Sequence, residues 1–305
     1  MTKAIYRKTF ATHEENIIKM RSRGIVINDE GKAKEYLKDI GYYRLGCYIF
    51  PFEKTYPKIG HKRKRDVAMG TTIEDIVAFY YYNMDMRNIL NKYLSRIEIA
   101  VRAAMVHELS SKYYTNPFWY VDKKIVDKDF IKKFKVVYDK NIKCKEPIQR
   151  FHARYKERFA PVWKTMEYAT FGNLENLYAN LLNSTDQSLV SKHFGEPSFQ
   201  KFGNYMSVMR EVRNACAHSN VIAELTLNNT IKSGSKACPT VRMDMQNTLG
   251  GALRIIGYML RQISRNRALD MQNELISATQ GIYTKVPYLQ PMIEQKTGIM
   301  LPFTL

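Results

Sequence analysis

Cysteine is scarce in this 305-residue sequence, which contains four cysteines, far apart and never as C-x-x-C. A disulfide framework and a cysteine-ligated zinc site are therefore not expected, and a reducing cytoplasm fits this usage. No apolar run approaches the roughly 18–20 residues that a membrane helix needs. The basic N-terminal stretch lacks an apolar core, so the sequence predicts neither a membrane anchor nor a secretory signal. The cysteines are Cys47, Cys144, Cys216 and Cys238.

The sequence also lacks the motifs of several enzyme classes. It contains neither G-x-x-x-x-G-K-[ST] nor G-x-G-x-x-G, so nothing supports a nucleotide-driven motor or a dinucleotide-dependent enzyme. There is no H-E-x-x-H, the six histidines are scattered, and the carboxylates form no pattern typical of a metal site. We therefore expect no metal and no cofactor, and any catalysis to be metal-independent.

Positive charge, in contrast, is abundant. The chain has 48 lysines and arginines against 29 aspartates and glutamates, a formal net charge of +19. Such an excess over a globular chain indicates a polyanionic partner, of which nucleic acid is the commonest. A merely basic surface is the alternative.

One basic run lies between Gly60 and Gly70 and is expected to form an exposed loop. It could bind phosphates, which makes its cations candidate RNA-binding residues, although such a run is more often simply a solvated loop. These cations are Lys62, Arg63, Lys64 and Arg65.

Hydrophobic periodicity is helical almost throughout and predicts an all-α fold. Apolar residues recur at steps of three and four from Thr71 to about Lys112, and Thr71-x-x-Glu74 is typical of a capping box. A small N-terminal helical module, 1–70, is expected before a larger helical domain, 71–305, although one continuous domain is also possible. Segments 42–52 and 219–244 are predicted to be irregular or extended. Further helices are predicted near 14–23, 30–40, 128–140, 150–158, 173–183, 186–194, 197–218, 245–266 and 270–278.

The predicted helix ending near residue 218 separates apolar from polar side chains. At about 100° per residue, its apolar residues share one arc and its polar residues the opposite one. The expected core residues are Tyr205, Met209, Val212 and Cys216. The expected polar stripe is Arg210, Asn214 and His218, flanked by Arg213.

These residue types suit cleavage of a phosphodiester. A histidine exchanges protons near neutral pH, an arginine can hold a phosphate and stabilise its developing charge, and an asparagine can orient the imidazole. RNA carries its own nucleophile, the 2′-OH. One histidine cannot easily serve both the attacking and the leaving oxygen, and Arg213 and His218 lie about 140° apart around one helix. Both facts favour a composite site at a two-fold dimer interface.

An arginine followed by a histidine after four to six intervening residues occurs three times in the chain, where about one occurrence is expected by chance. Taken alone, the spacing fits an ordinary polar helix face. The pairs are Arg7 and His13, Arg102 and His107, and Arg213 and His218.

The residues around the third pair carry more information. Arg213-Asn214-x-x-Ala217-His218 resembles the Arg-Asn-x-x-Ala-His signature of the Abi-like (AbiD/AbiF-type abortive infection) family, within the HEPN superfamily. Three further blocks resemble that family in the same order. They are "IGYYRL…Y…PF" at Ile40–Leu45, Tyr48 and Pro51–Phe52, "D..LR…IE…R" with Arg87, Ile97–Glu98 and Arg102, and "W…E…FG.L" at Trp163, Glu167, Phe171–Gly172 and Leu174.

The resemblance implies an all-helical HEPN ribonuclease of bacterial phage defence, which needs no metal and cleaves RNA as a homodimer in the cytoplasm. In that superfamily the Arg and His of the motif are catalytic, which assigns these roles to Arg213 and His218, with Asn214 assisting and Arg210 in support. The sequence departs from the family after the motif. Ser219–Ile222 stands where a second histidine and an "RLWN"-like tail are common.

The second pair is expected to support the site. Glu98 precedes Arg102 by one helical turn and can form a helix ion pair with it, and no Asn follows Arg102. Structural support is the first interpretation of Arg102 and His107, contact with substrate is the second, and a second catalytic pair is the third. Trp163 is expected in the core and Phe171–Gly172 at a helix break.

Two other functions stay open. A non-catalytic RNA-binding regulator would keep the helical scaffold and bind RNA without cleaving it. Alternatively, the chain could be an interaction module for a nucleotidyltransferase. A ribonuclease must be restrained in healthy cells. The excess positive charge fits the hypothesis that a bound structured RNA restrains or guides it.

Overall fold

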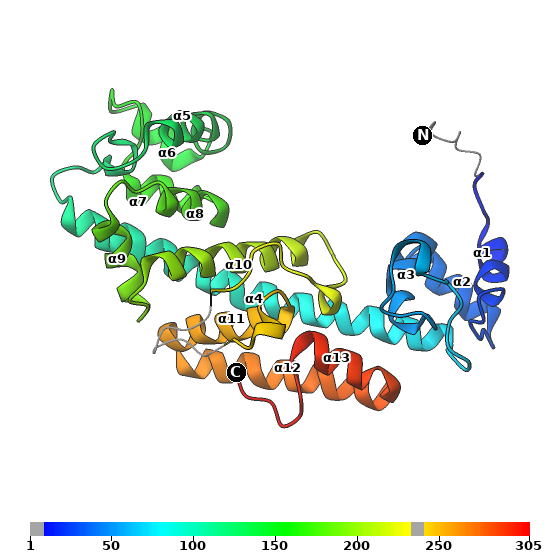
Figure 1. The fold of residues 1–305 in the computed structure, drawn as a ribbon. Coiled ribbons are helices and arrows are strands. Elements are labelled where there is room, and N and C mark those ends of the chain that lie inside the picture. Colours follow the sequence, from blue (N-terminus) through cyan, green and yellow to red (C-terminus); the bar gives the residue numbers. More distant parts are fainter. Residues whose placement is uncertain (1–8, 233–240) are drawn as a thin grey trace. The chain divides into compact units, whose positions relative to one another are not determined.

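The computed structural model describes residues 9–232 and 241–305, and this part of the chain is all-helical (Figure 1). It contains thirteen α-helices and no β-strand, which confirms the predicted fold class. Arg7 and Cys238 lie outside the described residues. The helices are α1 (His13–Arg21), α2 (Glu30–Asp39), α3 (Tyr42–Tyr48), α4 (Ile73–Lys112), α5 (Lys128–Val137), α6 (Glu146–His152), α7 (Val162–Thr165), α8 (Phe171–Ala179), α9 (Ser184–His193), α10 (Phe199–Ala217), α11 (Leu249–Ile263), α12 (Arg265–Lys285) and α13 (Gln290–Thr297).

The chain divides into two compact units. Unit 1 comprises the described part of Met1–Met86 together with Ser277–Gln295, and unit 2 comprises Arg87–Ile276 together with Lys296–Leu305. The division falls within α4 and within α12. The separate folding of residues 1–70 stays a prediction.

Unit 1 has an aromatic core around Phe79 of α4. Tyr48 and Phe52 both pack edge-on against its ring, at centroid distances of 6.1 Å. This packing explains one wrong prediction, because segment 42–52 is not irregular. Gly41, at φ +85°, starts α3, and a 3₁₀ turn follows at Phe50–Phe52. A glycine adopts this positive φ without steric cost.

Helix α4 runs through both units and confirms the strongest predicted helix, apart from its cap. Thr72 and Asp75, rather than Thr71 and Glu74, form the reciprocal pair: the Asp75 N–H donates to Thr72 Oγ1 at 3.1 Å, and the Thr72 N–H donates to Asp75 Oδ2 at 2.8 Å. The box is therefore shifted by one residue. No helix in the described chain is both long and apolar enough to cross a membrane.

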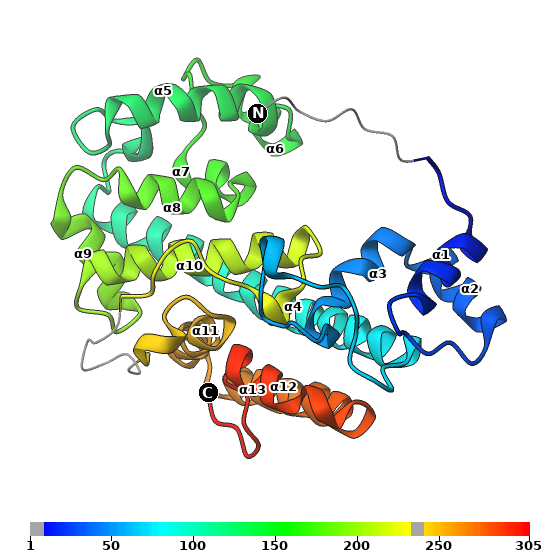
Figure 2. The same ribbon diagram turned by 45° about the vertical axis from the view of Figure 1, so that its right-hand side comes forward.

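Unit 2 is built around α10, which packs against α8, α9 and α11 (Figures 1 and 2). Helix α11 lies so close to its neighbours that Gly251 is required, because a Cβ there would meet the Met245 carbonyl oxygen at 2.3 Å. This close packing holds α11 against the turn that contains Met245.

Other helices differ from their predicted limits. The helix expected at 150–158 is α6, which ends at His152, and the one expected at 270–278 is the longer α12. The short α7 and α13 were not predicted. In segment 219–244 the described residues contain two 3₁₀ turns, Ile222–Glu224 and Met243–Met245, while residues 233–240 lie outside the described part.

Candidate functional site

The motif lies at the C-terminal end of α10, where the backbone is fixed by a Schellman turn. His218 is the C-cap, the Ser219 N–H donates to the Cys216 carbonyl at 3.1 Å, and the Asn220 N–H donates to the Ala215 carbonyl at 2.9 Å. Ser219 has φ +57°, a left-handed conformation that usually falls to glycine. From α4, Arg87 donates to the Asn220 carbonyl oxygen at 3.0 Å. The backbone on both sides of His218 is thus well defined.

The two arcs of α10 separate as the periodicity predicts. The apolar arc is buried, namely Tyr205, Met209, Val212 and Cys216. Burial raises the pKa of the Cys216 thiol to about 12, so this cysteine stays a neutral core residue. On the opposite arc, Arg210, Asn214 and His218 line one polar cavity of about 370 Å³.

Arg213 does not line this cavity. Its side chain is exposed and its Nη1 lies 3.5 Å from Asn214 Oδ1, a long contact. The structure therefore brings Asn214 and His218 together in the cavity, with Arg213 beside Asn214 on the neighbouring surface. Their catalytic roles stay predictions.

Arg210 is held by a partner that spacing could not reveal. Its guanidinium forms an ion pair with Glu175 of α8, whose side chain is only 15% exposed. The start of α8 lies against the same side chain, because a Cβ at Gly172 would be in van der Waals contact with Arg210 Cδ, at 3.4 Å. Phe171 and Gly172 are the first residues of α8, so they begin a helix. Because Glu175 already balances its charge, Arg210 supports the cavity wall more readily than it binds a phosphate.

The facing wall of the cavity was not found from the sequence. Glu211 accepts hydrogen bonds at 2.7 Å from both the N–H and the side-chain amide of Asn228, and longer ones from Asn229. All three residues line the cavity with His218. Glu211 adjoins the motif, but nothing in the spacing of Asn228 and Asn229 marks them as its partners.

The second predicted pair lies at a different cavity. Arg102 donates to Glu98 at 3.1 Å and to the Ala169 carbonyl at 3.0 Å, and both charged side chains are largely buried. Arg102 and His107 line a cavity of about 450 Å³ together with Trp163. The ion pair predicted between Glu98 and Arg102 is confirmed. The expectation that Trp163 is a core residue was wrong, since it is half exposed.

The basic loop belongs to unit 1 and its four cations are not equivalent. Arg63 donates to Glu53 through Nε at 2.6 Å and Nη2 at 2.7 Å, and the Glu53 side chain is almost fully buried. These hydrogen bonds raise the pKa of the Arg63 guanidinium, which thus anchors the loop. Lys62, Lys64 and Arg65 are exposed. Their binding of RNA stays a prediction.

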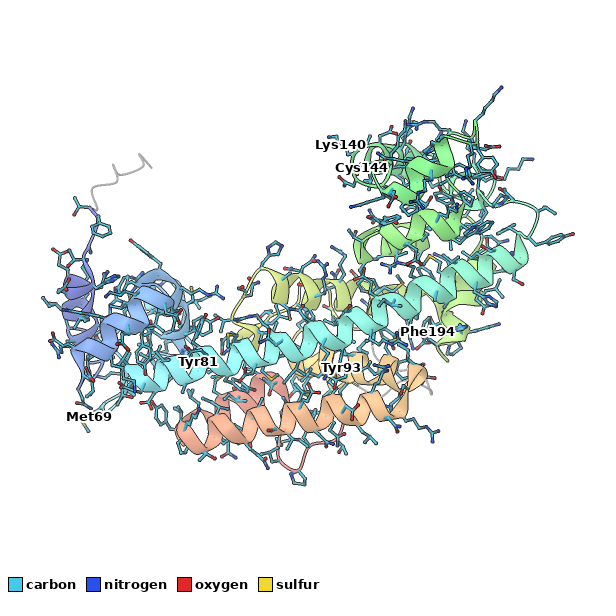
Figure 3. All side chains as sticks on the ribbon, turned by 180° about the vertical axis from the view of Figure 1, so that it is seen from behind. Met69, Tyr81, Tyr93, Lys140, Cys144 and Phe194 are labelled. Atoms are coloured by element: carbon cyan, nitrogen blue, oxygen red, sulfur yellow. The ribbon has the colours of Figure 1, made fainter. Side chains whose placement is uncertain are left out.

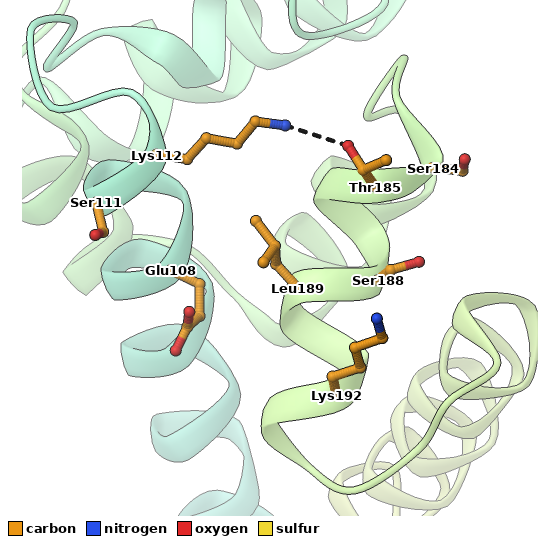
Figure 4. Close-up of a pocket in the computed structure, with 8 residues that line it drawn as sticks. All are labelled: Glu108, Ser111, Lys112, Ser184, Thr185, Ser188, Leu189 and Lys192. Carbon is orange, nitrogen blue, oxygen red and sulfur yellow. Dashed lines mark hydrogen bonds between the residues drawn. The ribbon is translucent and has the colours of Figure 1, made fainter.

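Another cavity, of about 630 Å³, contains none of the predicted site residues. It lies between the C-terminal end of α4 and α9, where Lys112 Nζ donates to Thr185 Oγ1 at 3.2 Å (Figure 4). Lys112 also forms an ion pair with the fully buried Asp186. Among the described residues, no three His, Cys, Asp or Glu side chains gather in a way that could hold a metal ion. Cys47, Cys144 and Cys216 are unbonded thiols.

The fold and the cavity at the end of α10 define an all-helical protein with an Arg-Asn-x-x-Ala-His motif at a helix C-terminus. The family model described as "Abi-like protein" matches residues 35–223, a range that includes all four sequence blocks. The chain belongs to the Abi-like protein family, whose name points to abortive infection, a form of phage defence. Comparisons with curated proteins and with solved structures give no match.

Proposed function

We propose that the protein is a metal-independent endoribonuclease of the HEPN type. The observation that carries the proposal is the cavity at the end of α10, where Asn214 and His218 lie one helical turn apart beside the exposed Arg213. An exposed imidazole and an exposed guanidinium on a rigid helix end are the groups that phosphodiester cleavage needs. Family membership supports the same class of function.

The chemistry uses the 2′-OH of RNA and the motif side chains of two copies of the chain. A base removes the proton of the 2′-OH, whose oxygen attacks the adjacent phosphorus, while an acid protonates the leaving 5′-oxygen. The P–O5′ bond breaks and leaves a 2′,3′-cyclic phosphate and a 5′-OH. His218 supplies one proton transfer, Arg213 stabilises the charge on the phosphate oxygens, and Asn214 orients the imidazole.

The second proton transfer comes from a second copy of the chain. At about 100° per residue, the positions of Arg213 and the C-cap His218 are about 140° apart around the axis of α10, so one copy presents the two groups in different directions. A two-fold dimer that joins two α10 ends places two motifs around one phosphate. The protein thus acts as a homodimer on RNA, in the cytoplasm, in defence against phage. A bound structured RNA would restrain it in uninfected cells.

Cleavage of mixed cellular RNA in EDTA tests the proposal. The wild type is expected to leave 2′,3′-cyclic phosphates and His218→Ala to leave RNA intact. His193→Ala is the matched control, because His193 is another exposed histidine of unit 2 that lines neither the α10 cavity nor the Arg102 cavity. Cleavage by folded His218→Ala at the wild-type rate would overturn the assignment.

A non-catalytic RNA-binding regulator gives a different outcome. Wild type and His218→Ala would then bind RNA equally, and neither would cleave it after removal of any co-purifying RNA at high salt.

A further inference from the structure

Nearly half of the net charge lies in one segment of unit 2. Residues 122–164, which we call the α5–α7 segment, contain fourteen lysines and arginines against six aspartates and glutamates, a net charge of +8 out of +19. The cations occur singly or in adjacent pairs over α5, α6, α7 and the connecting turns, so they form no run comparable to residues 62–65. Helices α5 and α6 lie side by side, and Lys140 and Cys144 lie on the turn that joins them (Figures 2 and 3).

All fourteen of these cations are exposed, and three of them form ion pairs within the described chain. The three are Lys132 with Asp129, Arg150 with Glu146, and Arg158 with Asp139. Exposed pairs of this kind are weak and are screened by salt. The segment therefore presents a concentrated positive surface to solvent, which is the electrostatic feature that a polyanion recognises.

Helix α5 arranges part of this charge in a stripe. Lys128, Lys132 and Lys135 follow one another at steps of four and three, so they share one face at intervals of about 6 and 4.5 Å along the axis. Phe130 and Phe134, on the opposite face, are buried and stack on each other. The lysine stripe thus faces outward by necessity, because the aromatic face is fixed in the core.

Aromatic rings accompany the charge. Tyr155 is 55% exposed, and its ring stacks on the buried Phe151 at a centroid distance of 4.9 Å with an interplanar angle of 28°. A half-exposed ring supported on one face presents its other face to solvent, as a stacking platform for a base requires. Arg154 and Lys156 flank Tyr155 and are exposed.

The segment is held in place by a buried tyrosine. Tyr138, in a π-helical turn (Tyr138–Ile142), accepts a hydrogen bond from the Ala160 N–H at 2.9 Å, and its hydroxyl lies 2.8 Å from His152 Nε2. Arg158 and Asp139 add an ion pair between the same two stretches. The lysine stripe and the Tyr155 platform therefore belong to one ordered surface.

We propose that the α5–α7 segment is the surface on which the protein docks single-stranded RNA. The lysine stripe contacts successive phosphates and Tyr155 stacks on a base. Exposed cations beside a supported aromatic ring match the two recognition elements of a single strand, whereas the buried aromatic face of α5 leaves no apolar face to insert into a membrane. The proposal rests on the proposed function, in which RNA is the substrate, and locates a contact surface away from the motif.

Binding is measured in full-length protein carrying His218→Ala, which is expected to hold RNA without cutting it. A labelled single-stranded oligonucleotide is titrated at several salt concentrations, with fluorescence anisotropy as the readout. The test variant adds Lys128→Gln, Lys132→Gln and Lys135→Gln, because glutamine keeps the helix propensity of lysine. For a single strand, each phosphate contact contributes about 0.7 to the slope of log K against log salt concentration. Losing three contacts should therefore weaken binding about 50-fold at 0.15 M salt and lower this slope by about 2.

Two controls test whether the loss of binding is specific to the lysine stripe and whether the ring of Tyr155 contributes to binding. Arg265→Gln, Arg267→Gln and Lys285→Gln remove the same charge from exposed positions of α12 and are expected to weaken binding less than about threefold. Tyr155→Ala is expected to weaken binding about tenfold, whereas Tyr155→Phe keeps the ring and the affinity.

Two results would count against the proposal in different ways. If the parent binds RNA and the lysine variant binds it with equal affinity and salt slope, the docking surface is wrong while the proposed function stands. If the parent binds no RNA at low salt, and the wild type cleaves none, both are overturned.

Discussion

The direction of Arg213 and His218 on α10 leads to a prediction about mixed dimers. Only His218 of this pair lines the polar cavity. At about 100° per residue, the two positions are about 140° apart around the helix axis. If each phosphate needs two copies of the motif, a dimer with one His218→Ala subunit lacks either the base or the acid. Loss of either lowers the cleavage rate by about 10²–10⁴, so mixed dimers count as inactive.

Random pairing sets the expected magnitude. With a threefold excess of His218→Ala, about one quarter of the wild-type chains have a wild-type partner in a two-fold dimer. Activity per wild-type chain should therefore fall to about one quarter. If one chain completed its own site, every wild-type chain would stay active and the value would not change.

The assay is RNA cleavage after the two proteins have exchanged subunits, with substrate in large excess so that binding by the variant does not compete. The same proteins mixed just before the assay are the control for exchange. His218 is exposed, so its removal should change the free energy of unfolding by less than about 0.5 kcal/mol. Undiminished activity after verified exchange would refute the composite site.

Three further predictions concern stability. Ser219→Gly should be more stable than Ser219→Ala by about 1 kcal/mol in urea unfolding. Both variants lack the hydroxyl, and only alanine is strained at φ +57°. Equal stability of the two variants would contradict the left-handed turn. Lys112→Met should lower the free energy of unfolding by about 2–3 kcal/mol, because the buried Asp186 carboxylate then keeps only its hydrogen bond from the Tyr113 hydroxyl, at 2.7 Å. Adding Asp186→Asn removes the buried charge and should restore most of this loss. Burial, followed by the charges of Lys143 and Arg158, lowers the pKa of His152 in the folded state. The unfolded state therefore binds more protons, and the α5–α7 segment should lose stability as the pH falls below about 6.5. Hydrogen exchange in α6 at pH 7 and pH 5 measures this change, which His152→Gln should reduce.

Hydrophobic periodicity predicted the helices that bury a regular stripe of their own apolar side chains. Helices α4 and α10 have apolar side chains at regular steps, so their length and buried faces follow from the sequence alone. Helix α3 was missed because two glycines and several aromatic residues obscure its pattern, and its stability comes from packing against Phe79. The capping box of α4 lies one residue later than predicted, because Thr71 and Thr72 are each followed three residues later by an acidic residue.

The candidate site was predictable on one side only. The motif face of α10 follows from the spacing of Asn214 and His218, whereas the opposite wall depends on contacts between distant residues. Asn228 of this wall meets Glu211 across 17 residues, and Glu175, outside the cavity lining, meets Arg210 across 35. No periodicity records such pairs. The charged surface of the α5–α7 segment is not evident from the sequence for another reason. Its cations are dispersed among apolar residues and form a surface only after folding.

That dispersed charge makes ionic strength act in two opposite directions. Fourteen exposed cations repel one another across a small segment, so added salt should screen this repulsion and raise the melting temperature of the free protein. The same salt should release bound RNA, which stabilises the folded state by binding to it. In the presence of RNA, melting temperature should therefore first fall with salt and then rise, with the minimum where the stability lost with released RNA equals the stability gained by screening.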